Sequence, residues 1–279
     1  MLLDRRGFSP GEIDGKAGRN FMLALSAFQE SQEIATTGQA DCDTWRALGG
    51  DTAEPIVTSY TVTDGDVQGP FVPDIPRDLE QQAKLPNLGY RSALEQIAER
   101  FHAAPALIQQ MNRGVGIAAG QRLEVPAVEP FDPNVKAAPD PKAGDVTIQV
   151  SREESAMRAT RADGTLVFFA PVTSGSEHDP LPPGNWKVAA VNWLPTFHYN
   201  PDLFWDAKPT DNRATLKPGP NNPVGVVWID INIEHYGMHG TPEPANVGHT
   251  PSHGCVRFTN WDAARLASLV KPGTPVIFK

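Results

Sequence analysis

The chain has 279 residues and a formal net charge of −9, with 27 prolines, 24 glycines and two cysteines. This length corresponds to about two domains of typical size, or three if two of them are small. Lysine and arginine are scattered and form no basic stripe of the kind that binds phosphates, so we expect no nucleic-acid partner. No apolar run reaches the roughly 18 residues of a membrane-spanning helix, so we expect no transmembrane segment.

The two cysteines, Cys42 and Cys255, are too few for a disulfide framework and lie in remote parts of the chain. We expect Cys42 to be a small packed residue. The first residues, MLLDRRGFSPG, lack the apolar stretch of a secretory signal, and we expect Met1 to be an artificial or trimmed start. The compartment must therefore be inferred from the substrate.

Residues 1–50 predict a module of three helices. Phe21, Leu25 and Phe28 share one helical face, with Met22 as a further candidate for that face. Gly38 is expected to stop this helix. In the following TTGQADCDTWRALG, an aspartate precedes a last short helix that carries a tryptophan and a leucine.

Residues 56–128 predict a second small module with the order strand, helix, helix, strand. YTVTDGD is typical of a strand and a turn, ALEQIAERFHAAPALIQQMN of two short helices, and GQRLEVP of a returning strand. Residues 67–90 form an insertion between the first strand and the first helix. Residues 129–145 are rich in proline, which predicts an extended linker.

From residue 146 to 279 the pattern changes to strands: VTIQVS, GTLVFFAPVTSG, NWKVAAVNW, VGVVWIDI and PVIF. Apolar alternation bounded by Gly, Pro and Asn predicts a mainly β domain, either a sandwich or a barrel. A late helix, NWDAARLASLV, is expected to begin at a cap formed by Thr259 or Asn260 and to bury Leu266, Leu269 and Val270. The whole chain is predicted to be a multidomain α+β protein.

Residues 250–260, TPSHGCVRFTN, contain the cysteine that is the candidate nucleophile. A free thiol has a pKa of about 8.5 and only the thiolate attacks, so Cys255 needs a neighbouring base. His239, His249 and His253 all lie within sixteen residues of it. Gly254 allows a sharp turn between His253 and Cys255, and leaves backbone N–H groups free to stabilise an oxyanion. This pattern favours a cysteine acyltransferase or peptidase.

Two alternatives remain open for the same residues. An inert, packed thiol would have apolar neighbours, which Cys255 lacks in the sequence. A zinc site could use His239, His249, His253 and Cys255 as four ligands, although no Cys-x-x-Cys or HExxH element accompanies them. We therefore predict no metal and no other cofactor.

Residues 192–223 form a long connection rich in Trp, Phe, Tyr and Pro. Connections of this length are uncommon unless they are functional, so we expect a flap or cleft wall over the thiol. The alternative is that the aromatic residues only pack on the sheet. Asp202, Asp206 and Asp211 could recruit a cationic amine, or could simply be solvated.

Three resemblances to known families add to this interpretation. MHGTPEPANVGHTPSHGCVRFTNWDAARLASLV resembles the active-site signature of the YkuD-type L,D-transpeptidases, and PLPPGNWKV and LKPGPNNPVGVVWIDI resemble that family's upstream strands. GFSPGEIDGKAGRNF, ALSAFQE and TTGQADCDTWRALG resemble a peptidoglycan-binding module. Residues 56–128 are similar to a LysM domain, a small glycan-binding module, interrupted by the insertion.

The YkuD resemblance implies roles for individual residues. Cys255 is the implied nucleophile, His239 the base, and Gly240 the residue whose carbonyl orients the imidazole. His253 and Gly254, together with Cys255, are implied to contact the oxyanion and the substrate. Arg257 either binds a peptide carboxylate or braces the loop. The implied substrate-binding positions are Ser252, Arg257, Thr241 and Asn260.

The resemblance also implies a reaction and its partners. The thiolate attacks a tetrapeptide stem of peptidoglycan, releases the terminal D-alanine, and passes the acyl group to an amine, which forms a 3-3 cross-link or anchors an outer-membrane lipoprotein. Hydrolysis by a carboxypeptidase or endopeptidase, and a non-catalytic protein that binds the cell wall, are the alternatives. Stem peptides and glycan are the expected partners, and a periplasmic or other extracytoplasmic location follows. The two N-terminal modules are expected to tether the enzyme to its substrate.

Overall fold

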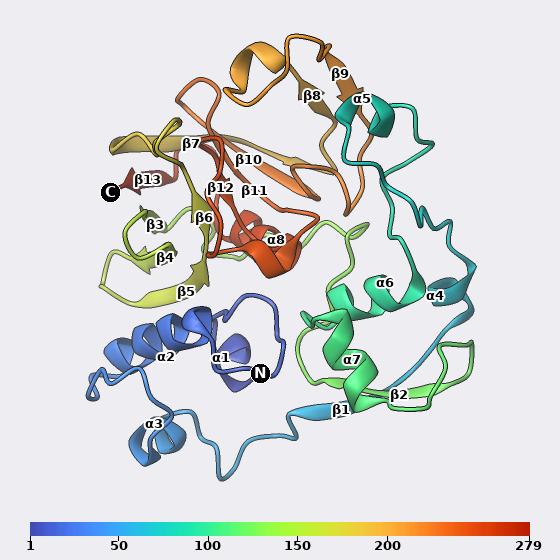
Figure 1. The fold of residues 1–279 in the computed structure, drawn as a ribbon. Coiled ribbons are helices and arrows are strands. Elements are labelled where there is room, and N and C mark those ends of the chain that lie inside the picture. The colour runs from blue at the N-terminus through green and yellow to red at the C-terminus, as the bar shows by residue number, and fades with distance from the viewer.

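The computed structural model describes residues 1–279 as three parts that pack against one another (Figure 1). The N-terminal part contains α1 (Leu2–Arg5), α2 (Arg19–Ser31) and α3 (Cys42–Ala47). Helix α2 buries Leu25 and Phe28 as predicted, whereas Met22 is 47% exposed and does not belong to the buried face. Asp41 caps α3, because its Oδ1 accepts a hydrogen bond from the backbone N–H of Thr44 at 2.8 Å.

Two predictions for this part are wrong. Helix α2 ends at Ser31, well before Gly38, and Gly38 instead turns the following loop with a φ of +66°. The buried Gln29 organises that loop: its Oε1 accepts from Gly38 N at 2.8 Å, and its Nε2 donates to Thr44 Oγ1 at 2.7 Å. Cys42 is exposed rather than packed, because it occupies the first, outward-facing position of α3.

The middle part has the predicted order of strand, helix, helix and strand, with two extra short helices. It contains β1 (Val57–Thr61), α4 (Asp64–Gln68), α5 (Leu79–Gln82), α6 (Ala93–Arg100), α7 (Pro105–Met111) and β2 (Arg122–Pro126). Strands β1 and β2 pair in antiparallel register. Helix α6 begins after the Ser92 cap and α7 begins with Pro105, a residue suited to the first helical turn. The insertion, which contains α5, lies between α4 and α6.

The C-terminal part is built on one nine-stranded sheet with the order β5-β4-β3-β13-β7-β10-β11-β12-β6. Its strands are β3 (Val146–Ser151), β4 (Ala156–Arg161), β5 (Leu166–Pro171), β6 (Thr173–Ser174), β7 (Gly184–Trp193), β10 (Val227–Ile231), β11 (Gly237–His239), β12 (Val256–Arg257) and β13 (Pro275–Phe278). A separate hairpin pairs β8 (Phe197–Tyr199) with β9 (Ala214–Leu216). Short 3₁₀ turns occur at η1 (Pro201–Leu203) and η2 (Pro244–Asn246).

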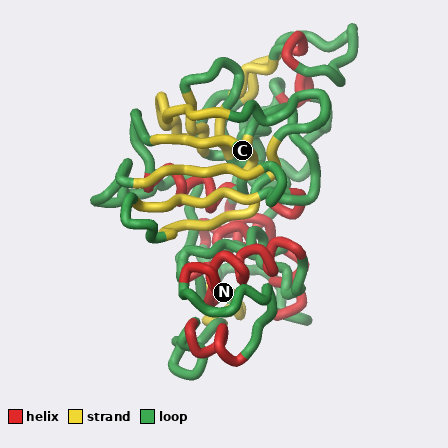
Figure 2. Tube along the Cα trace, turned by 90° about the vertical axis from the view of Figure 1, so that its left-hand side faces the viewer, coloured by secondary structure: helices red, strands yellow, loops and turns green.

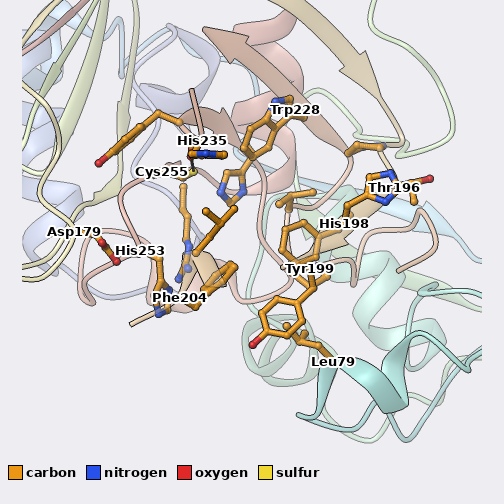
Figure 3. A pocket seen from close by; sticks show the side chains of 18 of the residues that line it. Leu79, Asp179, Thr196, His198, Tyr199, Phe204, Trp228, His235, His253 and Cys255 are labelled. Carbon is orange, nitrogen blue, oxygen red and sulfur yellow. Dashed lines mark hydrogen bonds between the residues drawn. The ribbon is translucent and has the colours of Figure 1, made fainter. Parts of the chain in front are cut away.

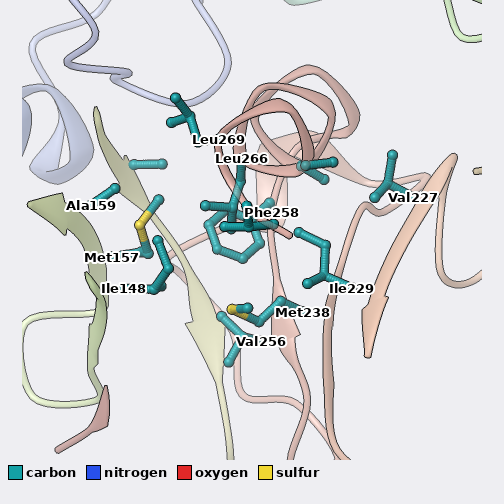
Figure 4. Packing of buried hydrophobic residues seen from close by; sticks show 14 of the residues in the cluster. Ile148, Met157, Ala159, Val227, Ile229, Met238, Val256, Phe258, Leu266 and Leu269 are labelled. Atoms are coloured by element: carbon teal, nitrogen blue, oxygen red, sulfur yellow. The ribbon is translucent and has the colours of Figure 1, made fainter. Parts of the chain in front are cut away.

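The nine-stranded sheet curls toward a barrel. Strands β5 and β6 stand at opposite ends of the strand order, yet only Val172 separates them in the chain, so the two edges must lie close together. Helix α8 (Asn260–Leu269) begins at the Thr259 cap and packs inside this curve. Figure 4 shows Leu266 and Leu269 facing buried side chains of the strands, and Figure 2 shows the strands side by side above the N-terminal helices. The predicted late helix and mainly β domain are therefore confirmed.

The N-terminal part docks directly on the edge strand β5. Phe169 N donates to Gly7 O at 2.8 Å, and Ser9 N donates to Phe169 O at 2.9 Å. These bonds cover an edge that would otherwise expose unpaired backbone groups. None of the helices in the protein combines the length and the apolar character that crossing a bilayer requires.

A buried junction joins all three parts. Asp4 Oδ2 of the N-terminal part lies 3.2 Å from His102 Nδ1 of the middle part. The His102 ring stacks on Trp261 of α8, with centroids 5.1 Å apart and planes 5° apart. Residues 129–145 contain no helix or strand, but Phe131 is buried in the core of the C-terminal part and Gly144 N donates to Leu269 O at 2.8 Å. This segment follows the protein surface instead of forming an extended linker.

The middle part also places a buried carboxyl group against the C-terminal part. Glu99 of α6 is buried, and its Oε1 accepts a hydrogen bond from Asn260 Nδ2 at 2.7 Å. Burial raises the pKa of Glu99 to about 7, against an ordinary value of 4.5. The folded protein therefore binds more protons at this group than the unfolded chain does between these two pH values, so its stability falls as pH rises through that window.

We predict that Glu99→Gln removes this pH dependence. The shift of the carboxyl corresponds to at most about 3 kcal/mol of unfolding free energy lost between about pH 4.5 and pH 7. The amide keeps an oxygen that accepts from Asn260, so the variant should match the wild type at pH 4.5 and exceed its stability at pH 8. Urea unfolding at the two pH values measures the difference, and an equal shift at both would contradict the assignment.

Candidate active site

The pairing of β11 with β12 brings the main candidate residues together. The two strands are parallel, with Met238 opposite Val256 and His239 opposite Arg257. Because side chains alternate along a strand, Met238 and Val256 point into the core, where both are fully buried. His239 and Arg257 project from the other face, and Cys255, two residues before Arg257, shares that face. These three side chains all line one cleft.

The imidazole of His239 is held in one tautomer. Its Nδ1 lies 2.6 Å from the carbonyl oxygen of Gly240. A carbonyl only accepts, so Nδ1 carries the proton and Nε2 is the unprotonated nitrogen. The ring stacks against Trp228, with centroids 5.3 Å apart and planes 15° apart. Burial, followed by the charge of Arg257, lowers the pKa of His239 to about 3, so the imidazole is neutral at physiological pH.

The thiol of Cys255 is also neutral at rest. Burial raises its pKa above the ordinary thiol value, and the backbone of Gly237 and the charge of Arg257 only partly offset this effect. Cys255 Sγ lies 3.6 Å from the carbonyl oxygen of His235, and the neutral thiol and the neutral imidazole line the same cleft. Such a pair can act as acid and base, in which the base takes the proton as the sulfur attacks. The alternative of an inert thiol does not fit, because polar and ionisable groups surround Cys255 in the cleft.

Arg257 supplies the positive charge of the cleft. Its Nε is buried and has no hydrogen-bond partner. Burial lowers the pKa of Arg257, and the Cys255 thiolate and the carboxylates of Glu243 and Asp206 act against this. A guanidinium that braced the loop would use its Nε for a protein acceptor, so the open donor favours the other predicted role, the binding of a carboxylate.

The loop before the cysteine is shaped by its small residues. Ser252 is buried, accepts from Gly175 N at 2.7 Å and donates to Cys255 O at 2.6 Å. Gly254 has a φ of +101°, and a Cβ at this position would lie 2.8 Å from the Tyr236 ring. The backbone N–H groups of residues 253–255 make no hydrogen bond within the chain, which leaves them available to an oxyanion.

The substrate-binding role predicted for Ser252, Thr241 and Asn260 does not match their positions. All three are buried and none lines the cleft. Their polar groups are used internally: Ser252 within the loop, Thr241 Oγ1 as acceptor for Glu243 N at 3.3 Å, and Asn260 between Val226 and Glu99. They position the site instead of facing it.

The four proposed zinc ligands do not converge. His239, His253 and Cys255 line the catalytic cleft, but His249 borders a different cavity beside residues 10–21. His253 turns its Nε2 toward Asp206 Oδ1 at 2.8 Å. The side chains are therefore arranged for acid and base chemistry and for contacts with the connection 192–223.

The cleft has a volume of about 1050 Å³. Figure 3 shows Cys255 and His253 at one end, Trp228 and Phe204 along its sides, and Leu79 of the middle part at the far end. Trp228, Tyr236 and Leu79 were not predicted from the sequence. In the strand VGVVWIDI side chains alternate between the two faces, so Trp228 points away from its neighbours on either side. This alternation is the only sequence signal that could have placed Trp228 in the cleft.

Comparison with known proteins assigns two parts of the chain. Residues 145–278 match the family model for the L,D-transpeptidase catalytic domain, YkuD, and residues 1–48 match that of a "Putative peptidoglycan binding domain". A "Putative L,D-transpeptidase YkuD" of Bacillus licheniformis is 28% identical over 186 residues, which cover 66% of this chain and 91% of that protein. "Probable L,D-transpeptidase YbiS" of Escherichia coli is 34% identical over 102 residues, covering 34% and 32%.

Two of the solved structures to which the chain is similar are L,D-transpeptidases. An L,D-transpeptidase from Mycobacterium smegmatis is 14% identical with a TM-score of 0.40, and covers 59% of this chain and 76% of its own. L,D-transpeptidase 3 from Mycobacterium tuberculosis is 15% identical with a TM-score of 0.40, and covers 59% and 77%. The family matches and the geometry of Cys255 and His239 lead to one assignment: the chain is an enzyme whose residues 145–278 belong to the YkuD family of L,D-transpeptidases, with a peptidoglycan-binding domain at residues 1–48.

Proposed function

We propose that this protein is a peptidoglycan L,D-transpeptidase that transfers the acyl group of a stem peptide through a thioester on Cys255. The observation that carries the proposal is the fixed tautomer of His239, which lines the same cleft as Cys255. With Nδ1 bound to the Gly240 carbonyl, only Nε2 is free to accept a proton. The peptidoglycan-binding domain in the same chain supports a cell-wall substrate.

Acylation follows from these groups. Sγ attacks the carbonyl carbon of the stem peptide while Nε2 of His239 takes the thiol proton. The carbonyl electron pair moves to oxygen, and the free N–H groups of residues 253–255 are the donors available to stabilise this oxyanion. When the intermediate collapses, the carbon–nitrogen bond breaks, and the imidazolium returns its proton to the departing amine of D-alanine. A thioester and a neutral imidazole remain.

The second half-reaction uses the same base. An acceptor amine attacks the thioester, His239 takes the proton that the amine loses, and the sulfur leaves as a thiolate that then recovers the proton. Water in place of the amine would give hydrolysis. We propose another stem peptide as the main acceptor, and an extracytoplasmic location follows from this substrate. An outer-membrane lipoprotein remains a candidate acceptor.

Arg257 is suited to bind the end of the stem peptide that is released when Cys255 is acylated. Its Nε lacks a partner in the chain, and Arg257 lies close enough to the thiol to influence its pKa. The terminal carboxylate of the stem peptide is the group that a buried, unpaired guanidinium selects. Binding that carboxylate would compensate the buried charge and place the adjacent peptide bond beside Cys255.

Replacement of the two central residues tests the chemistry. Cys255→Ala should form no covalent adduct with a purified disaccharide-tetrapeptide, and His239→Ala should lose about 10²–10⁴-fold in the acylation rate, because no other group takes the thiol proton. Intact-protein mass spectrometry follows the adduct, and cross-linked dimer or tripeptide distinguishes transfer from hydrolysis. A chelator should change nothing, whereas loss of activity that zinc restores would favour the metal-site alternative.

The pH dependence of acylation tests the assigned protonation state. Because the pKa of His239 is lowered to about 3 and that of Cys255 is raised, neither group titrates between about pH 5 and pH 8. The rate of acyl-enzyme formation should therefore be nearly constant over this range. An inflection near pH 6.5, the ordinary histidine value, would contradict this assignment, because it would show that the pKa of His239 is not lowered.

A further inference from the structure

The connection 192–223 needs support from outside the catalytic domain. Residues 192 and 193 end β7, and the rest of the connection has only the 3₁₀ turn η1 and the hairpin of β8 and β9 as regular structure. The hairpin has three paired positions and is not part of the nine-stranded sheet. A two-stranded hairpin of this size is at best marginally stable alone. Its side chains nevertheless form one wall of the catalytic cleft, so the shape of the cleft depends on whatever holds the hairpin.

The insertion of the middle part supplies this support through an apolar cluster. Leu88 of the insertion and Leu216 of β9 are both fully buried, and Tyr199 of β8 is nearly so. Further apolar residues from both segments pack around them: Ile75, Leu79, Ala83 and Leu85 from the insertion, and Phe197, Phe204 and Ala214 from the connection. Figure 1 shows α5 beside β8 and β9, away from the rest of the middle part.

Polar contacts fix the same interface. Glu80 Oε1 accepts from the backbone N of Asn212 at 2.7 Å and from its side-chain Nδ2 at 3.2 Å. Lys217 Nζ donates to Leu85 O at 2.6 Å. At Gly219 the two backbones come so close that a Cβ would lie 2.1 Å from Leu88 O. The insertion and the connection therefore behave as one packed unit.

The far end of the cleft combines this apolar wall with negative charge. Leu79 lines the cleft opposite Cys255, as Figure 3 shows, and Asp211 lines it from the connection, whereas Asp206 lies nearer the thiol end, where its Oδ1 is 2.8 Å from His253 Nε2. The pKa of the Tyr199 hydroxyl is raised by burial, and then by the charges of Asp211 and Asp206. The single arginine of the cleft, Arg257, lies at the thiol end. Arg257 suits the carboxylate of a donor peptide, and Asp211 suits a cationic group of an acceptor peptide.

We propose that the insertion of the middle part, residues 67–90, forms the acceptor end of the catalytic cleft, with Leu79 as a wall and Glu80 holding the connection 192–223 through Asn212. The acceptor is a peptide whose amine is cationic in water, loses one proton to solvent, and attacks the thioester as the free amine. This inference rests on the proposed acyl transfer. It makes the middle part a component of the active site in addition to any role in binding glycan.

Single substitutions in the full chain separate this role from catalysis. Removing the whole module would expose Tyr199 and Leu216 of the connection and is unsuitable. Glu80→Ala should raise the apparent KM for a disaccharide-tripeptide acceptor about tenfold, the usual effect of losing a hydrogen bond to a charged group. Leu79→Ala should raise the same KM severalfold. The rate at which a disaccharide-tetrapeptide donor alone forms the acyl-enzyme should stay within about twofold of wild type, since the thiol end is unchanged.

Matched variants control for unfolding. Glu80→Gln keeps an oxygen that accepts from Asn212 and should recover most of the acceptor affinity, and Leu79→Met should preserve the apolar wall. Gln81 of α5 and Lys84, which follows this helix, are both exposed, so Gln81→Ala and Lys84→Ala should behave like the wild type. Thermal unfolding of each variant confirms that the fold is retained.

The outcomes are distinguishable from failure of the proposed function. Unchanged acceptor KM in both Glu80→Ala and Leu79→Ala, with normal acylation, would overturn the inference and leave the acyl transfer intact. Parallel loss of acylation and transfer would show that the insertion supports the whole site, which also overturns the acceptor assignment. Absence of any acyl-enzyme on the wild-type protein would defeat the proposed function itself.

Discussion

The site depends on the hydrogen bond between His239 Nδ1 and the carbonyl oxygen of the next residue, Gly240. In many cysteine and serine enzymes a carboxylate or amide side chain orients the catalytic imidazole. Here the backbone does so, and a backbone carbonyl is rigid only if its surroundings are rigid. The packing around Gly240 therefore becomes part of the catalytic apparatus.

The contacts around Gly240 continue into the middle part of the protein. A Cβ on Gly240 would lie 2.2 Å from Asn260 Oδ1, so only glycine fits between the strand and α8. Asn260 is held in turn by Val226 N, which donates to its Oδ1 at 3.2 Å, and by Glu99 of the middle part, which accepts from its Nδ2. A chain of contacts thus runs from the middle part to the carbonyl that sets the histidine tautomer.

The sequence predicted the type of reaction better than it predicted which side chains lie together at the cleft. The strand pattern and the late helix were sufficient to predict the mainly β domain, and the motif around Cys255 was sufficient to propose a nucleophile and a base. Local patterns carry this information, because periodicity and motif spacing are local. Asn260 and Ser252 were predicted to bind substrate because motif membership does not reveal whether a side chain faces the cleft or lies behind it. Leu79 belongs to an insertion more than a hundred residues before the thiol, and only the fold brings the two to one cleft.

The docking of the modules changes what tethering can accomplish. A flexible linker raises the local concentration of a substrate over a range of orientations, and the gain falls as the linker lengthens. Residues 129–145 pack along the protein, the N-terminal part pairs with β5, and the junction of Asp4, His102 and Trp261 is buried. A glycan strand held by such modules would meet the cleft in one fixed orientation. Rigid docking would therefore select which stem along a strand can reach Cys255, whereas a loose tether would only increase how often any stem does so.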